Sequence, residues 1–299
     1  MQTVLRLAIA ALLAAAMPSY AMDRKSLATN DGAEISYWQS GSGKALVFLP
    51  GWSQSADQFE AQSALAETFQ VTAVDLRGHG ESSKVDYGYR IHRLAKDVHD
   101  LIEAEGLDDV TLVGHSMGAS VIWAYWDLYR DEHIDKIVVV DQTPSCAFNP
   151  DWSSAEKAAA GGLWDYNGLA AVSDQIKSSE AQKFASDFVN SAFFTSAFPQ
   201  HRKDEVLIEN MKLPRQQAAR LIFNHCSIDW RDLIATINVP MLIIGGEKSI
   251  FSVASLEWIR DTVPGARLEI FTEEEGGSHF MFMENPEKFN ALIADFVGQ

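Results

Sequence analysis

The chain has 299 residues, of which 47% are hydrophobic and 22% are charged. This is enough to bury a large core, as one big domain or as a domain with an insertion. Its formal net charge of −17 argues against nucleic acids and anionic membranes as partners, because both carry the same sign of charge as the protein surface.

Residues 1–21 have the pattern of a secretory signal peptide. Arg6 supplies the positive end, residues 7–17 an apolar run, and Ser19-Tyr20-Ala21 a small-x-small cleavage site. The run is too short to span a bilayer, so we favour a cleaved signal over a membrane anchor and expect no stable membrane insertion afterwards. The mature protein would then begin near Met22, carry a net charge of −18 because Arg6 is lost, and be periplasmic or secreted.

Short apolar runs alternate with helical patterns in the first half of the mature chain. Predicted strands cover residues 27–40 (a hairpin around Asn30-Asp31-Gly32), 45–49, 71–74, 110–113 and 136–140. Predicted helices cover residues 55–69, 90–105 and 118–129.

The alternation breaks between about residues 148 and 227, where helical periodicities and many aromatic residues occur without a strand of the buried type. It resumes with predicted strands at 239–244 and 266–271 and helices at 253–262 and 286–297. Such alternation indicates a mostly parallel sheet covered by helices on both faces. We therefore expect an α/β core made of residues 22–147 and 228–299, with residues 148–227 inserted after the sixth strand as a helical cap.

Residues 114–118 read Gly-His-Ser-Met-Gly and match Gly-x-Ser-x-Gly between a predicted strand and a predicted helix. This is the context of a nucleophile elbow. The turn forces the serine into a strained backbone conformation, and side chains at the glycine positions would collide with the neighbouring strand and helix. The Ser116 hydroxyl would then lie at a helix N-terminus, where free N–H groups favour negative charge.

Four motifs in register make the chain similar to the α/β-hydrolases over nearly all of its mature sequence. The motifs are Leu49-Pro50-Gly51-Trp52, residues 75–82, the elbow, and Gly277-Ser278-His279-Phe280 with residues 284–289. The resemblance implies the α/β-hydrolase fold and a serine hydrolase that uses no cofactor and no metal.

In this resemblance, His279 takes the proton of Ser116 and later protonates the leaving group. The backbone N–H groups of Trp52 and Met117 would form the oxyanion hole. Pro50 stands where the family usually has histidine and lacks an N–H, but the family's donor is the residue after the glycine. The serine at the elbow argues against dehalogenase and epoxide-hydrolase chemistry, which uses a carboxylate nucleophile in similar proteins.

The acid of the triad departs from the family pattern. Similar hydrolases carry an aspartate after the seventh strand, where this chain has Ser249, and a serine cannot hold a charge to steady an imidazolium. Asp141, at the end of the sixth strand, and Glu247, slightly early on the seventh-strand loop, are the two substitutes in reach. We favour Asp141, because some family members place their acid there, and keep Glu247 as the alternative.

Aromatic residues of the predicted cap, among them Trp152, Trp164 and Tyr166, are expected to roof an apolar pocket above Ser116. Such a pocket favours a small or medium apolar carboxylic ester or lactone as substrate. The same triad would also serve a C–C bond or amide hydrolase or a perhydrolase-like enzyme. A protein of this fold with an idle triad can instead bind a small molecule without turning it over.

The remaining histidines and the two cysteines show no metal-binding pattern. His92 and His99 lie seven residues apart on a predicted helix and are expected to be solvated. Cys146 and Cys226 flank the predicted cap, and in an exported protein they either pair or remain two separate buried thiols. The oligomeric state is not readable from the sequence.

Overall fold

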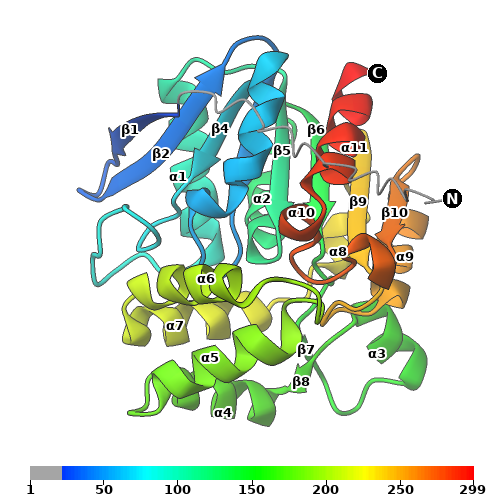
Figure 1. Ribbon diagram of the computed structural model, residues 1–299. Coiled ribbons are helices and arrows are strands. Elements are labelled where there is room, and N and C mark those ends of the chain that lie inside the picture. The colour runs from blue at the N-terminus through cyan, green and yellow to red at the C-terminus, as the bar shows by residue number, and fades with distance from the viewer. Residues whose placement is uncertain (1–21) are drawn as a thin grey trace, which may run out of the picture.

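The computed structural model describes residues 22–299, so the predicted signal peptide lies outside the described residues. Eight strands form one sheet in the order β1-β2-β4-β3-β5-β6-β9-β10 (Figure 1). β2 pairs antiparallel with β1 and β4, and every other neighbouring pair is parallel. The strands are β1 Asp23–Ala28, β2 Glu34–Gly41, β3 Ala45–Leu49, β4 Gln70–Val74, β5 Val110–His115, β6 Ile134–Val140, β9 Met241–Gly246 and β10 Arg267–Phe271.

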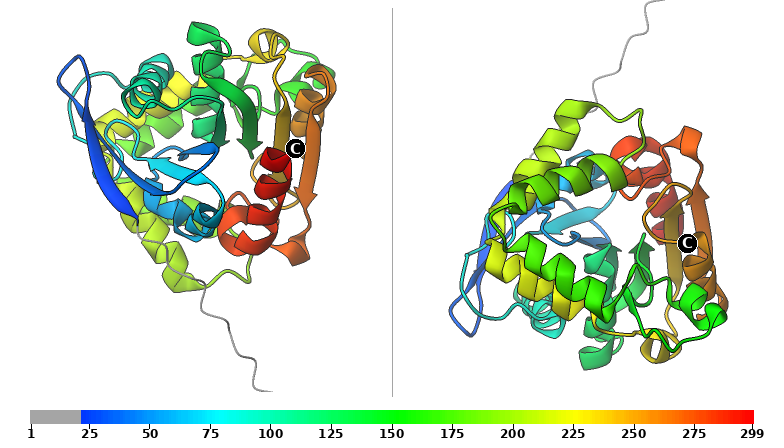
Figure 2. Two further views of the ribbon diagram at one scale, coloured as in Figure 1. Left: turned by 90° about the horizontal axis from the view of Figure 1, so that it is seen from above. Right: turned by 90° about the horizontal axis from the view of Figure 1, so that it is seen from below.

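Helices cover both faces of the sheet, as predicted (Figure 2). One face packs against α1 Ile91–Ala104, α2 Met117–Tyr129, α8 Arg231–Ile234 and α9 Val253–Thr262. The other packs against the 3₁₀ segment η1 Ala56–Glu67, α10 Met281–Glu284 and α11 Pro286–Gly298. A short 3₁₀ turn, η2 Glu273–Glu275, follows β10.

Strand β3 is apolar at every position, and the packing shows why. Val47 and Leu49 pack into the layer that contains α1 and α2, whereas Leu46 and Phe48 pack into the layer that contains η1 and α11. Successive side chains of a strand point to opposite faces, and both faces are covered here. No position of β3 is therefore left for a polar side chain.

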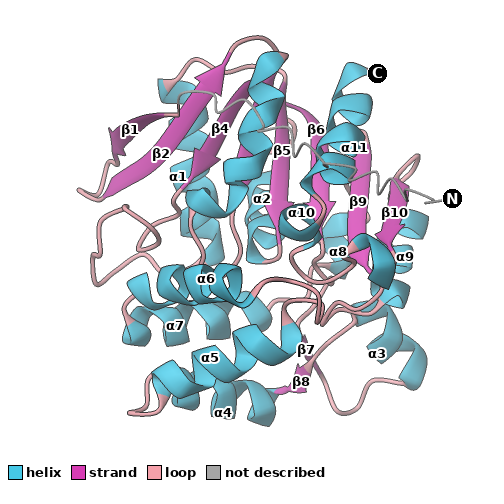
Figure 3. Cartoon of the chain, in the orientation of Figure 1, coloured by secondary structure: helices cyan, strands magenta, loops and turns pink. Residues whose placement is uncertain are grey.

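The segment between β6 and β9 forms the helical cap expected after the sixth strand. It contains β7 Ala147–Phe148, α3 Ser154–Ala160, β8 Trp164–Asp165, α4 Tyr166–Ile176, α5 Ala181–Ala192, α6 Gln200–Lys212 and α7 Arg215–Cys226. Helices α4 to α7 lie below the carboxyl ends of the parallel strands (Figures 1 and 3). The sequence did not predict the short parallel pair of β7 and β8, or that α3 would pack against α9 of the core.

Two local expectations were wrong. The helix predicted over residues 55–69 is a 3₁₀ segment interrupted by non-helical angles at Phe59. His99 is buried rather than solvated, because its ring stacks on Tyr129 of α2 with centroids 3.9 Å apart. His92 is substantially exposed, as expected, and lies 3.2 Å from a carboxylate oxygen of Asp127.

Within residues 22–299, no helix has both the length and the hydropathy needed to cross a membrane.

The loop after β4 contains a buried histidine that should make stability depend on pH. The His79 ring lies with Nδ1 3.0 Å from the Arg77 carbonyl oxygen, and Nε2 has no partner among the described residues. Burial lowers the pKa of His79 to about 4, whereas the pKa of a histidine in an unfolded chain is ~6.5. Between these values the unfolded chain binds more protons, so acidification lowers the free energy of unfolding.

We expect His79→Gln to remove roughly 3 kcal/mol of the stability decline between pH 7 and pH 4, since each unit of pKa difference corresponds to ~1.4 kcal/mol. Urea unfolding of both proteins at the two pH values measures this. The fall in the free energy of unfolding from pH 7 to pH 4 is compared between the wild type and the variant, and the difference is the contribution of His79. An equal fall in both proteins would show that the fold does not hold His79 neutral.

Candidate active site

Ser116 lies at the sharp turn between β5 and α2 with φ 51° and ψ −122°, a strained conformation for a residue with a side chain. The two flanking glycines are required for space. A Cβ on Gly114 would lie 2.5 Å from the Ala119 nitrogen, and one on Gly118 would lie 2.2 Å from the Leu49 carbonyl oxygen. The turn therefore has the geometry of a nucleophile elbow.

His279 and Asp141 form a buried pair. His279 lies in the loop before α10, and Asp141 directly follows β6 with φ 50°. The His279 Nδ1 and the Asp141 Oδ2 are 2.5 Å apart, which is a strong hydrogen bond in which Nδ1–H donates to the carboxylate. Burial lowers the pKa of His279 and so favours the neutral ring. Nε2 is then left free to accept a proton.

Ser249 occupies the slot where similar hydrolases carry their aspartate, and its hydroxyl donates a hydrogen bond to Asp141 Oδ2. The carboxylate therefore comes from the residue after β6, and the hydroxyl from the loop after β9. Burial raises the pKa of Asp141, and the bond from Ser249 opposes that change. Glu247 is exposed and accepts from the Glu273 backbone N–H instead, at 3.1 Å. The structure therefore brings Asp141, and not Glu247, to His279.

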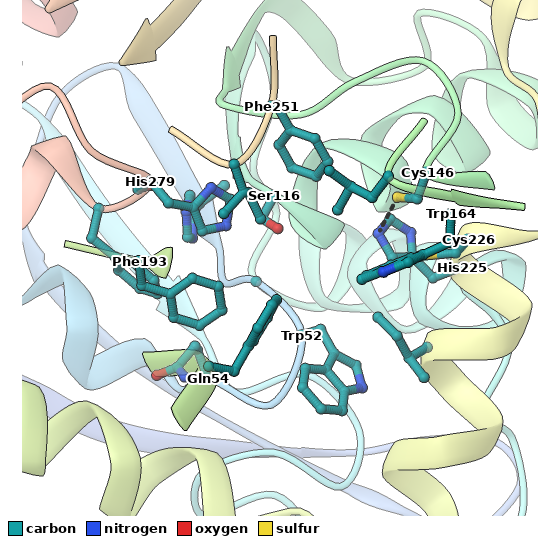
Figure 4. A pocket seen from close by; sticks show the side chains of 17 residues that line it. Trp52, Gln54, Ser116, Cys146, Trp164, Phe193, His225, Cys226, Phe251 and His279 are labelled. Atoms are coloured by element: carbon teal, nitrogen blue, oxygen red, sulfur yellow. Dashed lines mark hydrogen bonds between the residues drawn. The ribbon is translucent and has the colours of Figure 1, made fainter. Parts of the chain in front are cut away.

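Ser116 and His279 line the same cavity, and Figure 4 shows the serine hydroxyl directed into it. Among the described residues the hydroxyl makes no hydrogen bond, and none joins it to His279. Catalytic hydrogen bonds of this kind often form only with substrate in place.

His115 packs against His279 and makes a hydrogen bond to its backbone. Its ring is fully buried, with Nε2 2.9 Å from the His279 carbonyl oxygen. Burial lowers the pKa of His115, so the ring is neutral and its Nε2–H donates to that carbonyl. The elbow and the histidine loop, 164 residues apart in the chain, are thereby joined by one side chain. Sequence analysis did not identify this contact.

The two predicted oxyanion donors lie beside the nucleophile. Met117 is the first residue of α2, where the backbone N–H has no intrahelical acceptor. Trp52 follows Gly51, which approaches Ser116 so closely that a Cβ on it would lie 3.2 Å from the serine Cβ. Neither N–H donates a hydrogen bond within the described part of the chain. The Trp52 indole N–H donates to the Ala218 carbonyl oxygen of α7 at 2.9 Å, which attaches this loop to the cap.

Asp75 braces the same loop from the core. Its buried carboxylate accepts from the Ala56 backbone N–H at 2.7 Å, just beyond the loop that carries Trp52. It also accepts from Arg24 at 2.7 Å and from the Glu81 backbone N–H at 3.0 Å. The motif at residues 75–82 therefore supports the site without facing the cavity.

The space above Ser116 amounts to about 460 Å³ when the open solvent at its mouth is included. The cap contributes Leu163, Trp164, Phe188, Phe193 and Ile222 to its lining. Trp164 is where the sequence predicted it, but Trp152 and Tyr166 lie outside the lining. The Trp152 ring packs under the Arg231 guanidinium at 4.3 Å, and Tyr166 is 47% exposed at the start of α4. Their assignment to the pocket was wrong, because aromatic composition does not reveal which face of the cap each ring occupies.

The sequence did not predict that three polar side chains, those of Gln54, Cys146 and His225, line the cavity. Gln54 is 2% exposed, and neither amide atom has a partner among the described residues. Cys146 and His225 approach each other across the cavity wall, with Sγ 3.4 Å from Nε2. Cys146 and Cys226 are both buried free thiols. Of the two possibilities that the sequence left open, a disulfide or unpaired thiols, the structure shows the second. The one sequence feature that could have placed Gln54 in the cavity is its position two residues after Trp52, a predicted oxyanion donor.

Comparison with known proteins shows the family and the fold of the chain. The model of the alpha/beta hydrolase fold family matches residues 44–286. A non-heme haloperoxidase of Rhodococcus erythropolis is 28% identical over 281 residues, covering 90% of this chain and 97% of the relative.

Two solved structures are similar in fold. An esterase from Exiguobacterium antarcticum has a TM-score of 0.82 at 24% identity, covering 92% of this chain and 99% of the other. A bromoperoxidase from Bacillus anthracis has a TM-score of 0.82 at 24% identity, covering 94% and 100%. The chain belongs to the α/β-hydrolase family.

Proposed function

We propose that the protein is a carboxylic ester or lactone hydrolase that works through an acyl-enzyme on Ser116. The observation that carries the proposal is the buried His279–Asp141 pair beside a serine held on a strained turn in the same cavity. Nucleophile, base and orienting acid are the parts of a serine hydrolase triad.

In this proposal, the Ser116 oxygen attacks the substrate carbonyl carbon while His279 Nε2 takes the hydroxyl proton. The carbonyl oxygen becomes an oxyanion, stabilised by the backbone N–H groups of Trp52 and Met117. His279 then gives its proton to the departing alkoxide oxygen. Water repeats the sequence on the acyl-enzyme with His279 as base, which releases the acid and restores Ser116. Asp141 keeps the proton on Nδ1 throughout.

The cavity wall supports an apolar acyl or alcohol part with one hydrogen-bonding group. Trp164, Phe188 and Phe193 offer apolar contact, which is typical of small-molecule pockets. The unpartnered amide of Gln54 offers both a donor and an acceptor in the same cavity. We propose small or medium uncharged esters and lactones as the substrate class, and export to the periplasm or beyond as the setting.

The test is stoichiometric labelling of Ser116 by a fluorophosphonate, together with a burst of p-nitrophenol from a p-nitrophenyl ester. One label per chain and a burst equal to the enzyme concentration are expected. A panel of linear esters and acyl lactones, with and without an amide group, then defines the substrate. Tight binding of such compounds without label or burst would instead indicate a binding protein with an idle triad.

A second candidate is perhydrolase-like activity on the same triad, which the haloperoxidase and bromoperoxidase names of similar proteins favour. Hydrogen peroxide would replace water in attacking the acyl-enzyme, which gives a peroxy acid and free Ser116. Peroxy acid formation from an ester and hydrogen peroxide, measured against hydrolysis of the same ester, distinguishes the two. A ratio no greater than that of the non-enzymatic mixture excludes it.

A further inference from the structure

A second cluster of reactive side chains lines the cavity, apart from Ser116 and His279 (Figure 4). Cys146 lies just before β7, and His225 and Cys226 are the last two residues of α7. One ligand atom from each lies within 4.8 Å of the others, and all three residues are buried. The proposed hydrolysis uses none of them.

The spacing of the cluster suits a metal ion. Cys146 Sγ and His225 Nε2 are 3.4 Å apart. Sulfur and nitrogen ligands at ~2.3 Å and ~2.0 Å from a tetrahedral zinc ion lie about 3.5 Å from each other. Cys146 and His225 are therefore already at the separation that such ligands adopt around an ion, and Cys226 lies within 4.8 Å of both. Two sulfurs and one imidazole nitrogen are soft donors that favour Zn²⁺ or Cu⁺ over Mg²⁺ or Ca²⁺.

The burial of His225 fixes which of its nitrogens can bind an ion. The residue is 3% exposed, and its Nε2 is the ring nitrogen that faces Cys146 Sγ. Nε2 would therefore be the ligating atom, and Nδ1 would carry the proton of the neutral ring.

We propose that Cys146, His225 and Cys226 bind one soft transition-metal ion, of which Zn²⁺ is the probe of choice. Three protein ligands leave a fourth position for water or another ligand, and all three residues line the cavity that also holds Ser116. Binding requires both thiols as thiolates, so two protons are released from the cysteines when the ion enters. The ion connects the end of α7 to the segment that follows β6.

The experiment uses the protein from residue 22 onward, kept reduced with a phosphine, and Co²⁺ as a spectroscopic probe. One Co²⁺ per chain should produce a sulfur-to-cobalt charge-transfer absorption, which one equivalent of Zn²⁺ then removes. Cys146→Ser, Cys226→Ser and His225→Gln should each weaken binding by about 100-fold or more, above the range for outer-shell substitutions. Zn²⁺ should raise the thermal unfolding midpoint of the wild type, and far less that of these variants.

Two control variants test whether the charge-transfer absorption comes from the three proposed ligands. Ser116→Ala should bind Co²⁺ like the wild type, so a failure of the proposed hydrolase function leaves this test intact. His133→Gln alters a different group of possible metal ligands, which also contains His99 and Glu132. It should leave the charge-transfer absorption unchanged. Circular dichroism confirms that each variant is folded before its spectrum is compared.

Three results would overturn the proposal. The first is absence of the charge-transfer absorption in protein whose two thiols titrate as free. The second is an absorption that survives both cysteine substitutions. The third is a Cys146–Cys226 disulfide in protein exported and purified without reductant, since a disulfide removes both thiolate ligands.

Discussion

Replacing Ser116 by alanine should lower kcat/KM for a p-nitrophenyl ester by about 10⁶-fold, since loss of the nucleophile costs this much in a comparable serine hydrolase. The variant keeps the oxyanion donors and the cavity, so a small residual rate above the uncatalysed reaction is expected. Steady-state hydrolysis with active-site titration measures the loss.

Thermal unfolding provides the control for Ser116→Ala. The side chain makes no hydrogen bond among the described residues, so its removal should change the unfolding midpoint little. Activity within tenfold of the wild type would show that the hydroxyl on the strained turn is not the nucleophile. The proposed acyl-enzyme would then be wrong.

Asp141→Asn should lower kcat by about 10⁴-fold, the effect known for the equivalent change in a serine protease triad. The asparagine amide would donate to His279 Nδ1, at the contact that is now 2.5 Å long. The ring proton would move to Nε2, which then no longer accepts the proton of Ser116. Steady-state kinetics at pH 8 measures the effect.

Glu247→Gln is the matched control, because Glu247 is exposed and contacts the Glu273 backbone rather than His279. Its activity should stay within about twofold of the wild type, as for most surface substitutions. The double variant Asp141→Asn with Ser249→Asp should regain part of the lost rate, because Ser249 already touches the carboxylate. A severe loss in Glu247→Gln together with an active Asp141→Asn would reverse the assignment.

The motifs predicted what depends on local geometry. Gly114 and Gly118 are dictated by backbone contacts at the turn, so the elbow could be read directly from the sequence. The choice between Asp141 and Glu247 could not, because both follow strands of the parallel sheet and differ only in the direction of their side chains. The hydrogen bond from Ser249 to Asp141 also could not be predicted, because it depends on the three-dimensional arrangement of β6 and the loop after β9.

The cavity wall was the least predictable part. Trp152, Trp164 and Tyr166 belong to one aromatic-rich segment, and only the packing of the cap decides that Trp164 alone of the three lines the cavity. The contact between Cys146 and His225 joins residues 79 positions apart. No spacing rule for metal ligands covers such a separation, so the sequence did not indicate that these residues come together.

The hydrogen bond between the Trp52 indole and α7 makes the oxyanion hole depend on the position of the cap. One residue supplies both the backbone N–H that faces the developing charge and the side chain that is anchored to Ala218. In the proposed mechanism, an outward shift of α7 that keeps this bond moves the Trp52 N–H away from the carbonyl oxygen, whereas a shift that breaks the bond leaves the N–H in place. The proposed donor is therefore coupled to the cap only while the indole bond is intact.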